Sequence, residues 1–382
     1  EYQKFQDGCV TGTVNTKALD DALSGKAASG LGDGRLVVTT IQKLYHFVQN
    51  NPRHDAYAQH VVFIFDECHR SQFGMMRREI GRKFKKSHFF GFTGTPIFNE
   101  NARTIDGVRL TTDDVFGECL HRYTMANAIN DGKTLPFAID SYKTIEVCDD
   151  VKDGEKRVSD IDRTEAYHDK RRISEIVRGT LQNFPQKTMR KHRHELRRTN
   201  GEKVHVNGYG AMFATDSIDA ACLYYEEFKR QLAAYRQNDA DETSDEIVVA
   251  LVYTRNVDNE IIDGDDTLDN KSVLAEAIDD YNKRFNTHFS ATSTANGYIT
   301  DLQRRIADRH VDIVIVVNML LTGFDAPCVN TLYVDKELRS QMLIQAYSRT
   351  NRTFDDLKRY GNIVCYRDLQ LNTDEAIRLF CG

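Results

Sequence analysis

The 382-residue sequence is long enough for two α/β domains, each with a hydrophobic core of its own. Hydrophobic residues make up 40% and charged residues 28%, and no apolar run approaches the length of a membrane-spanning helix, so we expect no membrane partner. The net charge of -6 leaves the partner open, because local basic patches decide contacts with phosphate. Eight scattered cysteines without a CxxC pair predict a reducing, cytoplasmic compartment.

A series of short apolar runs, rich in β-branched and aromatic residues, predicts strands. They lie at 35–40, 61–65, 88–92, 137–142, 210–215, 246–254, 312–317, 331–335 and 362–366. Continuous apolar character is typical of strands that are covered on both faces, as in parallel sheets. We therefore predict an α/β fold with two doubly wound, mainly parallel sheets. The predicted domains are 1–140 and 209–382, joined by a linker and charged helical excursion at 141–208.

Polar residues follow the first three predicted strands, at the edge where open α/β sheets bind ligands. They are Thr39, Thr40 and Gln42 after the first strand, Asp66 and Glu67 after the second, and Thr93, Gly94 and Thr95 after the third. We expect the first group to donate hydrogen bonds to a nucleic-acid backbone and the third to couple the site to a facing domain. Each group is a weak signal alone, and the three together are specific.

The acid pair Asp66-Glu67 predicts phosphate chemistry. Mg²⁺ binds a few carboxylates and waters while substrate phosphates supply its other ligands, and a neighbouring carboxylate can orient the attacking water. We predict that Asp66 holds Mg²⁺ and that Glu67 activates water. An isolated acid pair more often caps the next helix, and this alternative is outweighed by the polar residues after the neighbouring strands.

The charged excursion holds a basic run at 187–198. Such a run could position a DNA backbone, and a flexible charged insertion is an equal alternative.

Five longer segments carry a family resemblance. They are TTIQKL (39–44), VVFIFDECHRSQFG (61–74), FGFTGTPIF (90–98), LLTGFDAP (320–327) and QAYSRTNRTF (345–354). DECH and TGTP are similar to motifs of superfamily 2 helicases and translocases, and the extended segments resemble the motor (R) subunit of type I restriction endonucleases. The resemblance implies two RecA-like domains with a cleft between them, ATP and Mg²⁺ as cofactors, and translocation along double-stranded DNA. It also implies methyltransferase and specificity subunits as partners.

The same resemblance implies roles for further residues. His69 would sense the state of the nucleotide, Thr322 would contact DNA, and Gly323, Asp325, Gln345, Arg349 and Arg352 would bind the nucleotide. Arg349 and Arg352 are three residues apart, so on a helix they would share a face and point together at a triphosphate. A solvated basic helix face is the alternative for two such arginines.

A complete motor of this family needs a P-loop, GxxxxGK[ST], and this sequence contains none. The GKT at 132–134 has Asn127 where the pattern requires glycine, which favours a turn. The resemblance implies that the P-loop and a nuclease domain precede this sequence in a longer protein, so we expect this chain alone to be inactive. A non-catalytic DNA-binding or assembly module, and another superfamily 2 motor such as a type III restriction subunit, are the alternative functions.

Overall fold

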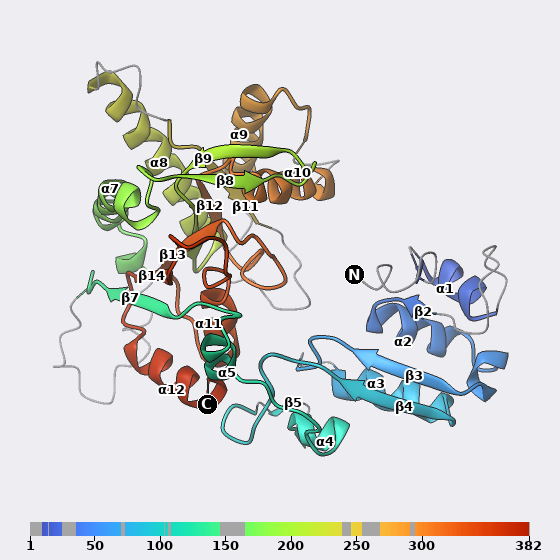
Figure 1. Ribbon diagram of the computed structural model, residues 1–382. Helices are drawn as coiled ribbons and strands as arrows, with labels where there is room; N and C mark the ends of the chain where they lie inside the picture. Colours follow the sequence, from blue (N-terminus) through green and yellow to red (C-terminus); the bar gives the residue numbers. More distant parts are fainter. Residues whose placement is uncertain are drawn as a thin grey trace. The chain divides into compact units, whose positions relative to one another are not determined.

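The protein forms two compact units, Glu1–Arg122 and Tyr123–Gly382, in a computed structural model (Figure 1). The structure describes residues 10–13, 15–24, 36–69, 73–102, 104–105, 108–145, 165–238, 246–253, 268–290 and 295–381. No helix in these ranges is long and apolar enough to cross a membrane.

The division between the units lies earlier than the boundary predicted at residue 140. The reason is that β7 (Phe137–Ser141) pairs in parallel with β14 (Gly361–Cys365) and so belongs to the second unit. Helix α7 (Lys170–Lys187), placed in the predicted linker, buries Ile173 and Phe184 in the core of the same unit. Backbone pairing and core packing therefore assign both elements to the second unit.

The first unit is built from short parallel strand pairs and helices. Its elements are β1 (Val10–Gly12), α1 (Thr16–Leu23), β2 (Leu36–Val38), α2 (Ile41–Asn50), the 3-10 helix η2 (Asp55–Ala58), β3 (Val61–Phe65), α3 (Phe73–Lys83), β4 (Ser87–Gly91), β5 (Thr104–Ile105), β6 (Val108–Arg109) and α4 (Thr112–Phe116). Strands β1 and β2 pair in parallel, as do β3 and β4, while β5 and β6 are antiparallel. The helices supply a core that includes Leu19, Phe47, Ile80 and Phe84.

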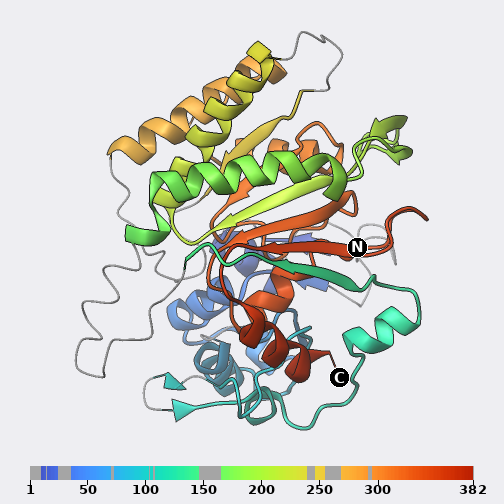
Figure 2. The same cartoon turned by 90° about the vertical axis from the view of Figure 1, so that its left-hand side faces the viewer.

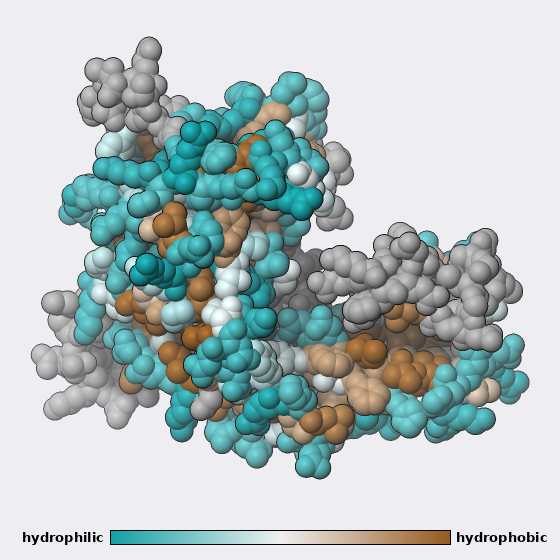
Figure 3. All heavy atoms as spheres, viewed as in Figure 1, coloured by the Kyte–Doolittle hydropathy of each residue, from teal (hydrophilic) through white to brown (hydrophobic). Residues whose placement is uncertain are grey.

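One face of the β3–β4 pair is exposed. Side chains alternate between the faces of a strand, so Phe63 packs inward with Phe89 whereas Val62 and Ile64 are 52% and 53% exposed. On and just after β4, Phe90 and Phe92 are also exposed, and Figure 3 shows apolar side chains gathered over these strands. Parallel strands are normally covered on both faces. This face of β3 and β4 differs, because its apolar side chains are exposed among the described residues.

The second unit contains a six-stranded parallel sheet in the order β11-β12-β10-β13-β14-β7. Besides β7, α7 and β14, its elements are α5 (Met125–Asn130), β8 (Arg193–Arg197), β9 (Lys203–Asn207), β10 (Gly210–Thr215), α8 (Ile218–Asn238), β11 (Val249–Val252), α9 (Leu268–Phe285), α10 (Ala295–Ala307), β12 (Ile313–Val316), β13 (Val329–Asp335), α11 (Ser340–Tyr347) and α12 (Gln370–Phe380). Helices α7, α8 and α9 pack on one face, and Figure 2 shows α12 on the other. Strands β10, β12, β13 and β14 are buried throughout, as their continuous apolar runs predicted.

All the predicted strands are present, and the mainly parallel α/β class is confirmed. The sequence analysis missed the antiparallel hairpin β8–β9 within the basic excursion. Its inward side chains include Leu196, and His194 stacks on Tyr209 at 4.8 Å between ring centroids. The basic run at 187–198 is thus the end of α7 and a hairpin strand, which overturns the alternative of a flexible insertion.

Replacing Ile80 by alanine should lower the free energy of unfolding of the first unit by about 2–5 kcal/mol, because this side chain is fully buried and its loss leaves a cavity. The matched change Ile64→Ala lies on the exposed face and should cost less than about 1 kcal/mol. Denaturant unfolding followed by circular dichroism measures both. Similar losses for the two variants would mean that the Ile64 face is covered.

Candidate functional site

The acid pair lies at the end of β3, in a turn that packs on the turn after β4. The Cys68 amide donates to the Phe92 carbonyl at 3.1 Å, and a Cβ added at Gly91 would lie 2.8 Å from the Cys68 sulfur. Glu67 has a left-handed backbone with φ of 50°, and its amide donates to the Asp66 carboxylate at 3.0 Å. This geometry leaves Asp66 exposed at the edge and half-buries Glu67.

His69 joins the two turns. Its Nδ1 lies 2.7 Å from the Thr93 hydroxyl, 3.4 Å from the Thr95 hydroxyl and 3.4 Å from Oε2 of Glu67. The Thr95 amide donates to the Thr93 hydroxyl at 3.0 Å, which fixes the turn, while Gly94 faces open space. The structure therefore brings together His69, Glu67 and the threonines that the sequence analysis assigned to coupling.

Asp66 suits a hard cation, since it offers exposed carboxylate oxygens. The described residues contain no group of three or more His, Cys, Asp or Glu side chains that could enclose a metal. A magnesium ion at Asp66 would therefore take most of its ligands from water and from phosphate oxygens, which is its usual preference.

The residues after β2 lie at the start of α2. Thr40 is the N-cap residue of this helix, and its hydroxyl accepts a hydrogen bond from the Lys43 amide at 3.3 Å. Gln42 is exposed in the first helical turn, and the Thr39 hydroxyl is buried without a hydrogen-bond partner among the described residues. Thr40 thus has a structural role beside its predicted one.

The predicted arginines do not share a helix face. Helix α11 ends at Tyr347, and Arg349 and Arg352 lie in the segment beyond it. Backbone pairing explains the early end, because the Leu135 amide donates to the Asn351 carbonyl at 2.8 Å and residue 352 forms a bridge with Thr134. The helical placement was therefore wrong. Gly132, in the rejected GKT, lies in a turn with φ of 66°, as predicted.

Both arginines nevertheless contact the 322–327 loop that follows β12. Arg349 donates from Nη1 to the Phe324 carbonyl and from Nε to the Gln345 carbonyl at 3.1 Å. Nε of Arg352 lies 3.1 Å from Oδ1 of Asp325, and both of these side chains are substantially exposed. The loop turns at Gly323, where φ is 70°, and Thr322 is half-buried. The second unit thus gathers all of its predicted site residues.

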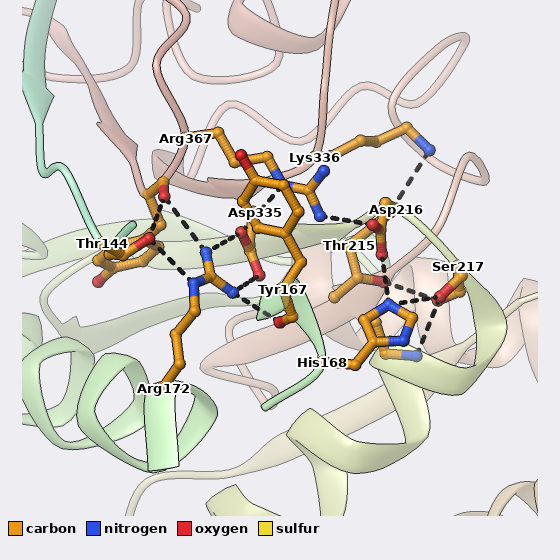
Figure 4. A network of polar contacts seen from close by, with 12 residues as sticks. Thr144, Tyr167, His168, Arg172, Thr215, Asp216, Ser217, Asp335, Lys336 and Arg367 are labelled. Atoms are coloured by element: carbon orange, nitrogen blue, oxygen red, sulfur yellow. Dashed lines mark hydrogen bonds and ion pairs between the residues drawn. The ribbon is translucent and has the colours of Figure 1, made fainter. Parts of the chain in front are cut away.

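A buried charge network fills the carboxyl ends of β10, β13 and β14 (Figure 4). Arg172 donates to both oxygens of Asp335, at 2.8 and 2.6 Å, and Arg367 donates to Asp335 and to Asp216. Asp335 is 2% exposed and also accepts from the Tyr224 hydroxyl at 2.6 Å. The sequence analysis missed this network. Its signal was visible in the sequence, because Asp216 follows the apolar run at 210–215 and Asp335 ends the run at 331–335.

His168 and Asp216 form the partly exposed end of the charge network, 3.4 Å apart. The hydrogen bond with Asp216 raises the pKa of His168, while burial opposes this. Burial acts to raise the pKa of Asp216, but His168 and Arg367 outweigh it and hold that pKa well below its usual value. Because these charges are paired within the protein, the strand ends of β10, β13 and β14 do not offer an open phosphate site.

Comparison with known proteins identifies relatives of this chain. Residues 2–172 match a family described as SWI2/SNF2 ATPase, and residues 207–368 match one described as type I restriction enzyme subunit R domain 3. The sequence is 39% identical over 386 residues to the type I restriction enzyme SauCOLORF180P endonuclease subunit of Staphylococcus aureus, covering all of this chain and 38% of that protein. Over its whole length, the chain is thus homologous to endonuclease (R) subunits of type I restriction enzymes.

A more distant R-subunit relative is the HindI endonuclease subunit of Haemophilus influenzae, with 27% identity over 87% of this chain and 29% of that protein. A solved fragment of a putative R subunit from Vibrio vulnificus has the same fold, with a TM-score of 0.56 and 15% identity over all of this chain and 54% of the other. Together with the six-stranded parallel sheet, this likeness confirms the predicted RecA-like α/β fold class. The chain spans 38% of the length of its Staphylococcus relative.

Replacing His168 by glutamine should reduce stability more at pH 5.5 than at pH 8. The pKa of His168 is raised by Asp216, so the ion pair contributes fully below the unfolded pKa of about 6.5 and is lost as the pH rises through the folded pKa. The difference should be about 1 kcal/mol or less, because the side chains are partly exposed. Denaturant unfolding at both pH values measures it, with the exposed His288→Gln as control. An equal loss at both pH values would contradict the assigned ion pair.

Proposed function

We propose that this chain is the motor portion of a type I restriction R subunit, which couples ATP hydrolysis to translocation along double-stranded DNA. The complete subunit would act in the cytoplasm with methyltransferase and specificity subunits, and a nuclease domain outside this chain would cleave the DNA. The observation that carries the proposal is the array in which His69 joins Glu67 to Thr93 and Thr95. Such an array links a carboxylate that can orient water to the turn after β4.

Glu67 and Asp66 divide the work of hydrolysis. Mg²⁺, when bound, supplies charge neutralisation for the phosphates of ATP. Asp66 would hold the ion with its exposed carboxylate, and Glu67 would accept a hydrogen bond from the attacking water and orient it. His69 contacts both Glu67 and Thr93, so a shift of the 93–95 turn would change the position of the Glu67 carboxylate. We infer that this contact couples DNA movement to hydrolysis.

Arg349 and Arg352 would stabilise the charge that develops in phosphoryl transfer. Their guanidinium groups are planar, permanently charged and rich in donors, which suits phosphate oxygens. In the structure they contact the Phe324 carbonyl and the Asp325 carboxylate, and Arg352 is 40% exposed. Gly323, Asp325 and Gln345 would shape this side of the nucleotide site.

Contacts with DNA would involve Thr39, Thr40, Gln42 and Thr322. Hydroxyl and amide groups near strand ends and helix starts commonly bind phosphate oxygens, and such contacts position a duplex without reading its sequence. Gln42 and Thr40 are exposed and satisfy this requirement most directly.

A non-catalytic DNA-binding or assembly module is the second candidate. The lack of a GxxxxGK[ST] segment in this sequence favours it for the chain by itself. The two candidates differ in whether the complete R subunit depends on Glu67 for ATP hydrolysis.

In the complete R subunit, Glu67→Gln should lower DNA-stimulated ATP turnover by about 10²-fold or more, because glutamine cannot accept the proton of the attacking water. The substitution keeps the side-chain volume, and DNA affinity should stay within about threefold of the wild type. Glu79→Gln, on the surface of α3, is the control and should leave turnover unchanged. Equal rates for wild type and Glu67→Gln would favour the non-catalytic module.

Arg349→Met and Arg352→Met test the arginine assignment in the same subunit. If one of them stabilises the transition state, its loss should reduce ATP turnover by about 10³-fold with little change in DNA affinity. Arg339→Met, an exposed arginine just before α11, should behave as the wild type. Turnover within about threefold of the wild type for both variants would assign these arginines to holding the 322–327 loop alone.

A further inference from the structure

A buried lysine contacts the end of the loop that holds the candidate site of the second unit. Lys358 is 2% exposed, and its Nζ donates to the carbonyls of Pro327 and Val329 at 2.7 and 2.9 Å. These carbonyls flank the junction between the 322–327 loop and β13. No role described so far uses Lys358, although burying an amino group is costly unless its donors are satisfied.

The backbone of Lys358 is itself fixed to the core. Its amide donates to Oδ1 of Asp355 at 2.9 Å, and the same oxygen accepts from the Tyr209 hydroxyl at 2.6 Å. Tyr209 is fully buried, and its amide donates to the Thr188 carbonyl at the end of α7. The lysine therefore projects from a rigid base, so its amino group can hold the loop in a defined place.

Two further polar contacts with the loop come from arginines that have a different proposed task. Arg349 donates to the Phe324 carbonyl, and Arg352 pairs with Asp325 in an exposed position. If these arginines turn to a triphosphate, as in the proposed function, the loop loses these two contacts. The Lys358 contacts are buried and do not depend on that step, so they would keep the loop end in place throughout.

We propose that Lys358 is a positioning residue for ATP hydrolysis, which keeps the 322–327 loop in register with Arg349 and Arg352 by binding the Pro327 and Val329 carbonyls. This inference rests on the proposed function of the chain as an ATP-driven motor. Lys358 does not contact the reacting atoms; it acts through the loop.

The charge state of Lys358 does not alter the contacts that the proposal needs. Burial lowers its pKa to about 7, Cys328 and the carboxylates of Asp355 and Asp325 act to raise it, and Arg352 acts to lower it. An ammonium group has three N–H donors and a neutral amine two, so either form can bind both carbonyls. Methionine has a similar length and no donor, so it removes both hydrogen bonds at little change in volume.

The test compares Lys358→Met, Lys358→Arg and the exposed neighbour variant Arg359→Met in the complete R subunit. Lys358→Met should lower the kcat of DNA-stimulated ATP hydrolysis about 10- to 100-fold with KM for ATP within about threefold, because misplaced groups lose transition-state contacts more than ground-state binding. Amide hydrogen exchange should accelerate at 322–329 and not across the whole unit. Lys358→Arg keeps donors and should recover at least about a third of kcat, and Arg359→Met should match the wild type.

A kcat for Lys358→Met within about twofold of the wild type would overturn the proposal, as would unchanged exchange at 322–329 or faster exchange spread over all of the second unit. If Lys358→Met does not fold, Lys358→Arg decides by the same measurements. A kcat no better than one hundredth of the wild type with unchanged exchange at 322–329 refutes the proposal, as does a wild-type kcat with loosened 322–329 amides. If the wild-type subunit shows no DNA-stimulated ATPase, the proposed function fails, while exchange at 322–329 still shows whether Lys358 holds the loop.

Discussion

The second unit depends on the carboxylate of Asp335, which is buried at the end of β13 and accepts hydrogen bonds from Arg172, Arg367 and Tyr224. These donors come from α7, from the segment just after β14 and from α8, so one side chain ties the strand ends to the helices on one face. Removing one partner of a buried ion pair typically costs about 3–5 kcal/mol, because it leaves an uncompensated charge. That constraint ties α7 to the strand ends of this unit.

Chain connectivity explains how the site residues of the second unit meet. Parallel neighbours require every connection to return from the carboxyl end of one strand to the amino end of the next. The connections β12–β13 and β13–β14 therefore both arrive at the same edge, where the 322–327 loop joins β13 and the 348–360 segment joins β14. Arg349, Arg352 and Lys358 reach the loop because the sheet delivers both segments there. The Asp335 network lies at the opposite, carboxyl edge of the sheet.

The sequence predicted what depends on local pattern and missed what depends on pairing between distant segments. Every continuous apolar run became a strand, since burial on both faces leaves such a signal in the run itself. The end of α11 before Arg349 is set by backbone bonds to 134–135, more than 200 residues away in the chain, and no local pattern reports them. The β8–β9 hairpin was hidden by its basic outward residues, although Leu196, Val204 and Val206 alternate with them. Asp66 and Glu67 were predicted because they directly follow a strand end, whereas the prediction for His69 came from the family resemblance.

Backbone strain gives a further reason to regard the acid pair as functional, although it is not sufficient. Glu67 and Leu320 are non-glycine residues with φ of 50° and 67°, each within a motif segment, and such conformations cost of order 1 kcal/mol or more. Met189, Asn286, Arg309 and Ser340 share this conformation outside the candidate site, so strain alone does not mark function. At Glu67 the conformation has a specific effect, because it leaves the Asp66 carboxylate exposed while directing Oε2 of Glu67 towards His69. Relaxing that turn would separate the proposed cation ligand from the group proposed to orient water, so the strain is tied to the proposed chemistry at this position.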